Sequence, residues 1–358
     1  MRLLRALATS SLVMNQNNPY KRSKPYTGEP SSKVIGTHSG TFQCDEAMGV
    51  WLLRQLPEFR NSKVVRSRDK NVLEPLDIVI DVGGVYDHAI KRYDHHQRGF
   101  EERFTPDGIT KLSASGLVYR HYGKEVISEL YPSLSEEHLD FAFTKMYESF
   151  MEAIDAIDTG VEVAPEVKFR DNTGLSSRVA RMNPRWNEEV TNESADQKFE
   201  EASNMCGDDF CNVLSELIES QIPAFNLVEQ ALLSRYEVDK SGEIMMFPSG
   251  GLPWKKHLYT LEKKHRVDPL VKYVLYTDQS GMWRIQAVTE EGFAFKNRLS
   301  LPESWRGVRD EDLAKIAKIP GCTFCHAAGF IGGNKSFEGV LQMARVALEE
   351  GDKDSIKE

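Results

Sequence analysis

Aspartate and histidine residues gather in three short stretches of this chain, and each stretch contains an apolar run rich in β-branched residues or closely follows one. The stretches read VIGTHSGTFQCDE at 34–46, DIVIDVGG at 77–84 and YDHHQRGF at 93–100. Open α/β sheets place their ligands outside the carboxyl ends of the strands. Carboxylates and imidazoles that converge there can hold two divalent metal ions, which can activate water and clamp a phosphoryl group.

The strongest single feature is Asp94-His95-His96, because one carboxylate and two imidazoles in three residues are costly to bury without a function. The alternative explanation for this tripeptide is a hydrogen-bonded turn. Asp81 closes a predicted strand just before Gly83-Gly84, a position that suits a ligand carboxylate.

Four further residues gain weight as members of the same set. His38 by itself is more often structural than a ligand, and Asp45 opens a predicted helix, where an acid caps the helix or complements its dipole. Asp155 and Asp158 lie near the end of an apolar helical segment. An acid at a helix C-terminus opposes the dipole, so Asp158 requires another reason to be there.

The elements that would position these residues alternate between strand and helix from 33 to about 165. Alternating elements of this length predict an α/β fold, with a mostly parallel sheet flanked by helices. Strands are predicted at 33–37, 63–66, 77–82 and 90–93, and helices at 45–55, 112–131 and 135–158.

The pattern changes beyond residue 170. Residues 170–240 are polar and helical, with a long amphipathic helix predicted at 208–236. Strands return from 243, a hairpin is predicted around 279–281, and a final helix at 336–350. We therefore predict a basic leader at 1–32, a metal-binding domain at 33–165, a helical connector at 166–240 and a smaller α/β substrate-binding domain at 241–358.

The composition is that of an ordinary globular protein of 358 residues, 40% hydrophobic and 28% charged, with a net charge of −9. That charge argues against a molecule that is basic as a whole, although a local basic groove for nucleic acid remains compatible with it. No apolar run approaches the roughly 20 residues of a membrane span. Five cysteines do not suggest a disulfide scaffold in this chain, and Cys322-x-x-Cys325 indicates two core thiols rather than a zinc knuckle.

The leader differs from the rest of the chain. Residues 1–28 carry basic side chains and no acidic one. The stretch MRLLRALATSSLV can form a basic amphipathic helix, which predicts a mitochondrial presequence. The alternatives are a disordered basic tail and a nuclear-import signal at 21–24.

Eight stretches of the chain carry a resemblance to a known family: GTHSGTFQCDEA, DIVIDVGGVYD, RYDHHQRGF, KMYESFMEAIDAIDTG, LSSRVARMNPRWN, PWKKHLY, YTDQSGMWRIQAV and PGCTFCHAAGFIGG. The Asp and His clusters resemble the four motifs of the DHH phosphoesterase superfamily. Residues 34–348 more closely resemble the Myg exonuclease family (melanocyte proliferating gene family). The resemblance implies a DHH-like α/β domain, a second smaller α/β domain and an active site in the cleft between them.

The same resemblance implies a metal-dependent 3′–5′ exonuclease that acts on RNA, in mitochondria and in the nucleus or nucleolus. It implies two metal ions, the first held by His38 and Asp81. The second would be held by Asp45, Asp81, His95 and Asp158, with Asp81 bridging the two ions and Asp155 as the alternative fourth-motif ligand.

His96 would face the scissile phosphate rather than a metal ion. Asp94 would orient His95 through a hydrogen bond, as metal-bound imidazoles usually require. An oxygen-rich site with few imidazoles and no thiolate suits two Mn²⁺ ions, with Mg²⁺ as the alternative.

One residue departs from the family pattern. The family has His where this chain has Gln43, two residues before Asp45. In the wider superfamily that position corresponds to a ligand of the first metal ion, and a Gln amide oxygen is a weaker ligand than an imidazole. A loosely bound first ion, an inactivated variant, a site completed by His38 and water, and natural drift at a tolerant position all remain open.

The second domain would supply contacts to the substrate. His326 and the glycines Gly332 and Gly333 resemble the glycine-rich substrate loop of this superfamily, where exposed N–H groups can cradle a phosphate. Trp186, Trp254 and Trp305 each lie close to a basic residue and could stack on unpaired bases. Further candidates for phosphate contacts are Arg178, Arg181, Lys255, Lys256, His257, Arg284 and Arg306.

We therefore predict a 3′–5′ exoribonuclease whose partner is single-stranded RNA and whose products are nucleoside 5′-monophosphates. Two alternatives remain. One is a phosphoesterase for pyrophosphate or short oligonucleotides, and the other is a catalytically weakened RNA-binding protein that has lost a ligand at Gln43.

Overall fold

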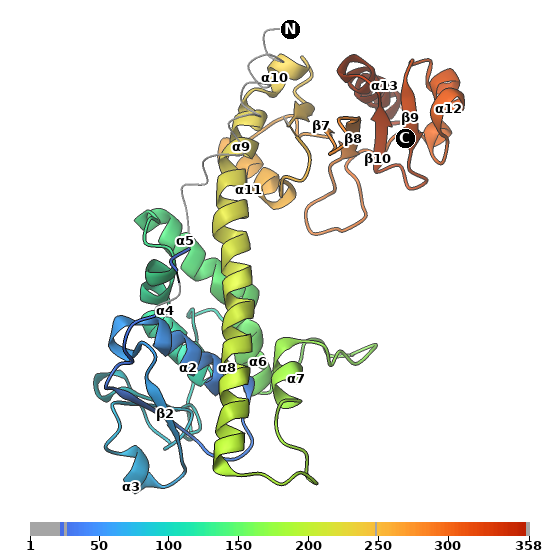
Figure 1. The fold of residues 1–358 in the computed structure, drawn as a ribbon. Coiled ribbons are helices and arrows are strands. Elements are labelled where there is room, and N and C mark those ends of the chain that lie inside the picture. The colour runs from blue at the N-terminus through green and yellow to red at the C-terminus, as the bar shows by residue number, and fades with distance from the viewer. Residues whose placement is uncertain (1–21, 25–26, 248, 356–358) are drawn as a thin grey trace. The chain divides into compact units, whose positions relative to one another are not determined.

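The computed structural model describes residues 22–24, 27–247 and 249–355, so most of the predicted leader lies outside the described residues. The chain is an α/β protein that divides into two compact units, with the boundary between Glu219 and Ser220 (Figure 1). This boundary falls inside the segment 166–240.

The first unit is built on a five-stranded sheet in the order β2-β1-β3-β5-β4. The pairs β1–β2, β1–β3 and β3–β5 are parallel, and only β4 runs antiparallel to its neighbour β5. This arrangement confirms the mostly parallel sheet and its four predicted strands. The strands are β1 (Val34–Thr37), β2 (Lys63–Arg66), β3 (Ile78–Ile80), β4 (Tyr86–Asp87) and β5 (Arg92–Tyr93).

The helices of the first unit pack around α2, which contacts both α4 and α8. The contact with α8 is close at Gly207, where an added Cβ would lie 1.9 Å from Nε1 of Trp51. The helices are α2 (Cys44–Gln55), α3 (Lys70–Leu73), α4 (Ala114–Leu130), α5 (Glu136–Met146), α6 (Glu152–Asp158), α7 (Leu175–Ala180) and α8 (Asn192–Ser215).

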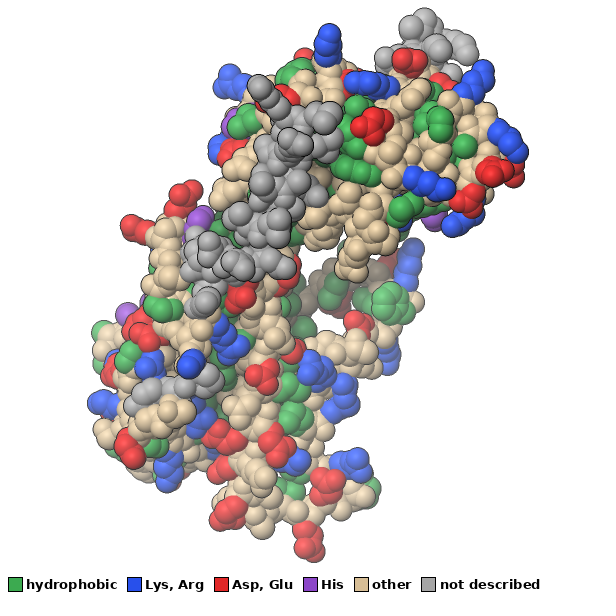
Figure 2. Space-filling view, turned by 45° about the horizontal axis from the view of Figure 1, so that its top comes forward, with side chains coloured by type: hydrophobic (Ala, Val, Ile, Leu, Met, Phe, Trp, Pro, Cys, Tyr) green, Lys and Arg blue, Asp and Glu red, His purple; other side chains and the backbone are tan. Residues whose placement is uncertain are grey.

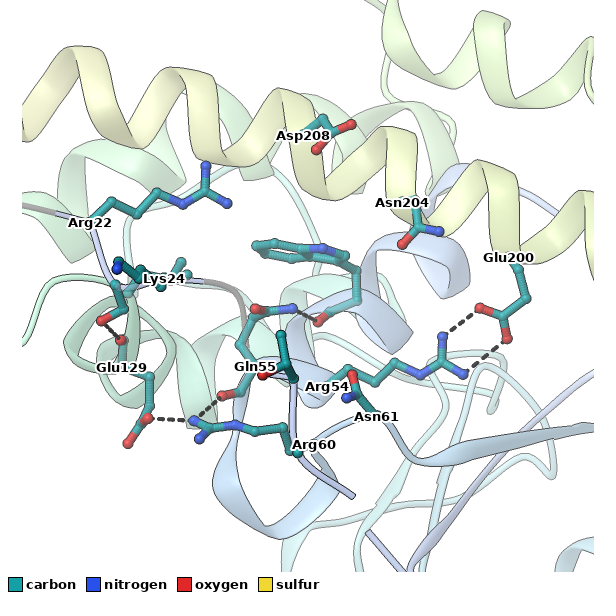
Figure 3. A pocket seen from close by; sticks show the side chains of 15 residues that line it. Arg22, Lys24, Arg54, Gln55, Arg60, Asn61, Glu129, Glu200, Asn204 and Asp208 are labelled. Carbon is teal, nitrogen blue, oxygen red and sulfur yellow. Dashed lines mark hydrogen bonds and ion pairs between the residues drawn. The ribbon is translucent and has the colours of Figure 1, made fainter. Parts of the chain in front are cut away.

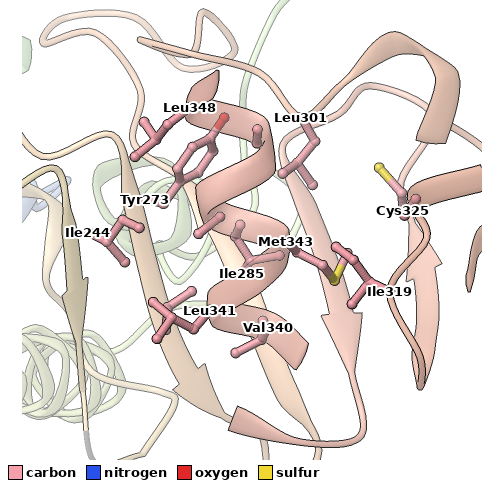
Figure 4. Packing of buried hydrophobic residues seen from close by; sticks show 14 of the residues in the cluster. Ile244, Tyr273, Ile285, Leu301, Ile319, Cys325, Val340, Leu341, Met343 and Leu348 are labelled. Atoms are coloured by element: carbon pink, nitrogen blue, oxygen red, sulfur yellow. The ribbon is translucent and has the colours of Figure 1, made fainter. Parts of the chain in front are cut away.

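The second unit has a mixed sheet in the order β6-β7-β8-β10-β9. The β6–β7 pair is parallel and the other pairs are antiparallel, including the predicted hairpin between β7 and β8. Tyr273 and Ile285 from this sheet pack with Val340 and Met343 of α13 in one buried cluster (Figure 4). The elements are α9 (Ile222–Leu233), α10 (Arg235–Val238), β6 (Ile244–Met246), α11 (Lys255–His265), β7 (Tyr273–Thr277), β8 (Trp283–Ala287), α12 (Asp310–Ala317), β9 (Cys322–Cys325), β10 (Ile331–Asn334) and α13 (Phe337–Ser355).

Two predicted helices are interrupted by π-helical turns. The segment 135–158 contains such a turn at Tyr147–Met151, and the predicted helix at 208–236 contains another at Glu216–Gln221. The helices α11 and α12 were not predicted, whereas Cys322 and Cys325 are buried free thiols, as expected of core residues.

The described helices include none that is both long and apolar enough to cross a membrane. On the face shown in Figure 2, acidic and basic side chains are interspersed.

Candidate metal centre

Five of the predicted residues meet at the carboxyl edge of the first sheet. His38 comes directly after β1 and Asp81 directly after β3, whereas one residue separates His95 from the end of β5. Two helices supply the other two residues, since Asp45 lies in the first turn of α2 and Asp158 ends α6. Parallel pairing explains the convergence, because it directs the ends of all three strands to the same edge.

Asp81 lies at the centre of this cluster. Its Oδ2 is 3.3 Å from Nε2 of His38, and its Oδ1 is 3.4 Å from Nε2 of His95. Nε2 of His95 is also 3.1 Å from Oδ2 of Asp158. The two oxygens of Asp81 thus face two different imidazoles, which is the placement that a bridging ligand needs.

Two carboxylates of the cluster are buried and lack hydrogen-bond donors. Asp45 and Asp81 are 1% and 3% exposed. Within the described part of the chain, neither oxygen of either residue has a hydrogen-bond partner, and Nε2 of His95 has none either. Buried polar atoms are normally satisfied, and oxygen ligands suit Mn²⁺ and Mg²⁺. These orphaned atoms therefore fit bound divalent cations.

The electrostatics of the cluster support the same conclusion. Burial raises the pKa of Asp45 well above its usual value, and the neighbouring charges of Asp81, Glu46 and Asp158 raise it further. Burial also opposes ionisation of Asp81, but His38 and His95 outweigh it and hold its pKa below the usual value. The site thus concentrates negative charge that a cation would compensate.

Glu46 is a member of the cluster that sequence reasoning missed. It is fully buried in the first turn of α2, and its Oε1 lies 3.0 Å from Nε2 of His38. His38, Glu46 and Asp81 each offer a ligand atom within 4.8 Å of the others. The sequence signal that could have identified Glu46 was its position beside Asp45 in the predicted first turn. It was overlooked because an acid there is already explained by the helix dipole.

Gln43, where the resemblance predicts a histidine, is the exposed N-cap residue of α2. Its backbone N–H donates to both carboxylate oxygens of Glu46, at 2.9 and 3.0 Å. The position therefore anchors Glu46 through the backbone, whichever side chain it carries.

The structure corrects the predicted role of Asp94. Its Oδ1 accepts hydrogen bonds from Nδ1 of His96 at 2.7 Å and from the backbone N–H of His96 at 3.1 Å, and its Oδ2 accepts the N–H of Gly84. Asp94 therefore orients His96, and no hydrogen bond joins it to His95 in the structure described. The side chain of His96 is 61% exposed, and its Nδ1 lies 3.5 Å from Oδ1 of Asp81.

Asp155 and Asp158 have different surroundings, and the carboxylate of Asp155 bonds to residues outside the cluster. Its Oδ1 accepts hydrogen bonds from the N–H and the hydroxyl of Ser113, and its Oδ2 accepts one from the hydroxyl of Tyr147. Burial raises the pKa of Asp155 to about 7. Gly116 leaves room for it, since a Cβ there would lie 2.3 Å from its oxygens. Asp155 therefore connects core elements, and Asp158 is the residue of α6 that offers a ligand atom to the cluster.

The two arginines of the first unit that were predicted to contact phosphate already have partners within the protein. Arg178 forms an ion pair with Asp209 at 2.7 Å, and Arg181 donates to the carbonyl of Asn172. Trp186 is 97% exposed, which is compatible with the predicted stacking.

In the second unit, Arg284 and Gly333 face each other on paired strands. A Cβ at Gly333 would lie 2.7 Å from Nη1 of Arg284, so the glycine makes room for the guanidinium. Arg284 is paired with Asp278. Gly332 precedes Gly333 on β10, and His326 is exposed just after β9.

Three predicted contacts of the second unit need correction, because those side chains are in the core. His257 is only 9% exposed and packs edge-on against Phe225, and burial lowers its pKa. Trp254 and Trp305 are also buried. Lys255 begins α11 and lies over the ring of Trp254.

A cavity of about 770 Å³ in the first unit is separate from the cluster (Figure 3). It is lined by Trp51 and by Arg54 and Arg60, which pair with Glu200 and Glu129. None of the candidate metal ligands lines this cavity.

Fold and site together define an α/β protein with a candidate divalent-metal centre at the carboxyl edge of a mostly parallel sheet. The chain belongs to the MYG1 exonuclease family, described as an uncharacterised protein family (UPF0160), whose model matches residues 34–348.

Relatives in several organisms extend over nearly the whole chain. The MYG1 exonuclease of Mus musculus is 44% identical, with 95% of this chain and 90% of the mouse protein covered. The MYG1 exonuclease of Homo sapiens is 44% identical, with 93% and 89% covered. A MYG1 protein of Saccharomyces cerevisiae is 43% identical, with 92% and 99% covered. No solved structure gives a significant match.

Proposed function

We propose that this protein is a metal-dependent exonuclease that removes nucleotides from the 3′ end of single-stranded RNA and releases nucleoside 5′-monophosphates. The observation that carries the proposal is the pair of buried carboxylates, Asp45 and Asp81, whose oxygens have no hydrogen-bond partner among the described residues. The relatives named MYG1 exonuclease support nuclease chemistry. The RNA substrate and the 3′–5′ direction rest on the motif resemblance.

The ligand atoms present are sufficient for two divalent cations that share Asp81. When bound, such ions lower the pKa of water toward neutrality and stabilise charge that develops on a phosphoryl group. One ion would be held by His38, Glu46 and Asp81, and the other by Asp45, Asp81, His95 and Asp158.

The protein's own groups would position the substrate. Asp94 holds Nδ1 of His96 at 2.7 Å, which leaves Nε2 of this exposed ring directed to other partners. We assign Nε2 of His96 to a non-bridging oxygen of the scissile phosphodiester, to which it donates when both ring nitrogens carry a proton. Asp94 would act as a positioning residue, because it accepts from Nδ1 and fixes the orientation of the ring.

The test is manganese-dependent digestion of a 5′-labelled single-stranded RNA by the protein, by Gln43→His and by Asp81→Asn. Asp77→Asn is a matched control, because Asp77 lies just before β3 and Asp81 just after it. We expect a shortening ladder from the protein and from Asp77→Asn, and none from Asp81→Asn.

Three other outcomes would contradict the proposal. Cleavage of pyrophosphate or short oligonucleotides alone would indicate a small-substrate phosphoesterase. A ladder from Gln43→His alone would identify a weakened form of an enzyme. RNA retention without cleavage, with fewer than two ions bound per chain, would indicate a binding protein.

A further inference from the structure

Arg68 lies at the rim of the metal cluster and has no role in the chemistry described above. It follows β2, whose parallel register with β1 sets Arg66 beside Thr37. The N–H of Ser67 then donates to the carbonyl of Thr37 at 2.8 Å. This pairing brings Arg68 next to His38, the first residue after β1.

The guanidinium of Arg68 touches the outer face of a candidate ligand. Its Nη2 lies 3.2 Å from Nδ1 of His38, and its Nε donates to the carbonyl of Ser39 at 3.1 Å. The other ring nitrogen of His38 faces Asp81 and Glu46. One imidazole ring therefore separates the positive charge of Arg68 from the carboxylates of the cluster.

The loop that carries Arg68 is held in place by local hydrogen bonds. Ser67 Oγ accepts the N–H of Asp69 at 3.0 Å, and Oδ1 of Asp69 accepts the N–H of Asn71 at 2.9 Å, capping α3. The backbone beside the cluster is thus preorganised, which lowers the cost of ordering an arginine for a ligand.

Arg68 is exposed, and the described residues provide no carboxylate ion pair for it. In this respect it differs from Arg178 and Arg284, which are paired with Asp209 and Asp278. Its charge is therefore available to an anionic ligand without breaking an existing ion pair.

Nδ1 of His38 already has a partner, because it lies 3.2 Å from the carbonyl of Ser39. An Nδ1–H that donates to this carbonyl cannot accept from a guanidinium, so Nη2 of Arg68 needs another acceptor. A phosphate oxygen matches the fork of an arginine well.

We propose that Arg68 is a catalytic residue that binds the phosphate group of the substrate beside the metal centre. The proposal rests on the proposed function, in which this phosphate belongs to the terminal nucleotide. The juxtaposition of Arg68 with His38 is local to the first unit, so it depends on no residue of the second.

The test compares the protein with Arg68→Ala, Arg68→Lys and Lys70→Ala, each loaded with Mn²⁺. Lys70→Ala is the matched control, because it removes an exposed positive charge only two residues along the chain from Arg68. Calorimetry would measure the affinity for adenosine 5′-monophosphate and, separately, the uptake of Mn²⁺. Single-turnover digestion of RNA would give the rate of cleavage.

We expect Arg68→Ala to weaken binding of the nucleotide by about 10- to 100-fold, the range for a lost hydrogen bond to a charged group. The cleavage rate should fall by about 10²- to 10³-fold, as for loss of one group that stabilises developing charge. Both effects should be intermediate in Arg68→Lys. In Lys70→Ala the nucleotide affinity and the cleavage rate should stay within about threefold of the original values. Mn²⁺ uptake and the melting temperature should be unchanged in all variants.

Equal nucleotide binding by Arg68→Ala and Lys70→Ala would overturn the proposal. Loss of Mn²⁺ uptake in Arg68→Ala would also overturn it, because Arg68 would then only position His38. If the protein binds the nucleotide through Arg68 but does not shorten RNA, the exonuclease proposal fails and the phosphate site stands. If it neither binds the nucleotide nor cleaves RNA, both fail.

Discussion

Nε2 of His38 lies 3.0 Å from Oε1 of Glu46, and both side chains are buried. Burial opposes the charged form of His38, yet its contacts with Asp81 and Glu46 outweigh burial and raise its pKa to about 10. Glu46 thus acts on His38 together with the predicted ligand Asp81. With Gln43 in place of the predicted histidine, the site therefore still has three ionisable groups that could serve as ligands, His38, Glu46 and Asp81.

Replacing Glu46 with Gln should weaken binding of one Mn²⁺ ion by about 10- to 100-fold, because a neutral amide is a poorer ligand than a carboxylate. The amide oxygen can still accept the N–H of Gln43, so the start of α2 should be preserved. Titration calorimetry with Mn²⁺ would measure the effect, with Glu58→Gln on the surface as the control. An affinity equal to that of the control would exclude Glu46 from the site.

Uptake of metal ions should release protons. Burial opposes protonation of His95, but Asp158 and Asp81 outweigh it and raise its pKa to about 10, like that of His38. At pH 7 the metal-free protein therefore holds more protons than the loaded protein, and raising the pH favours loading. We expect release of at least two protons per chain, since ligand imidazoles must be neutral.

Calorimetry of Mn²⁺ binding in buffers of different ionisation enthalpy would count these protons. The apparent affinity should rise between pH 6 and pH 8. An affinity that is constant over this interval would show that the two imidazoles are not ligands.

His121 should make the metal-free protein lose stability as the pH drops from 7 to 5. Burial, His88 and Arg120 lower the pKa of His121 to about 4 from a usual 6.5. Between these values His121 binds more protons in the unfolded chain than in the folded one, so its contribution to stability is lost as the pH falls through this window. His121→Gln removes this titration and keeps a partner for the hydroxyl of Tyr86.

Urea unfolding at pH 7 and pH 5, with a chelator present, would measure the difference. The free energy of unfolding at pH 5, relative to that at pH 7, should be higher in His121→Gln than in the original chain. An identical difference in both would rule out His121 as a contributor.

Gly207→Ala should destabilise the protein by about 1–3 kcal/mol, the usual cost of overpacking a core. The new Cβ would lie 1.9 Å from Nε1 of Trp51, so α2 and α8 would have to separate. Gly174→Ala is the control, because a Cβ there meets no atom within 4 Å and its φ is −61°. Thermal melting of both variants would show the difference, and equal melting temperatures would disprove the close approach.

The strands, their parallel arrangement and the grouping of His38, Asp81 and His95 could be predicted from the sequence. These features depend on local patterns, since apolar β-branched runs form strands and each ligand lies within two residues of a strand end. Once the strands pair in parallel, the residues that follow them lie at the same edge of the sheet.

The roles of individual side chains depended on contacts between distant segments. Asp155 and Asp158 share a helix and differ by three residues, but only Asp155 meets Ser113, 42 residues away. Sequence spacing cannot show which of two carboxylates will meet a donor from α4. The burial of His257 likewise depends on how α9 packs against α11.

The sequence alone was sufficient to determine the α/β class and the family and to predict a metal site, because these are encoded in residue types and short sequence patterns. Only the tertiary structure placed Glu46 beside His38, turned Asp94 toward His96 and brought Arg68 to the rim of the cluster. The contact of Arg68 depends on the register of β1 with β2, and the contact of Glu46 depends on how α2 packs beside the end of β1. Both are set by the packing of separate elements, which local sequence patterns do not specify.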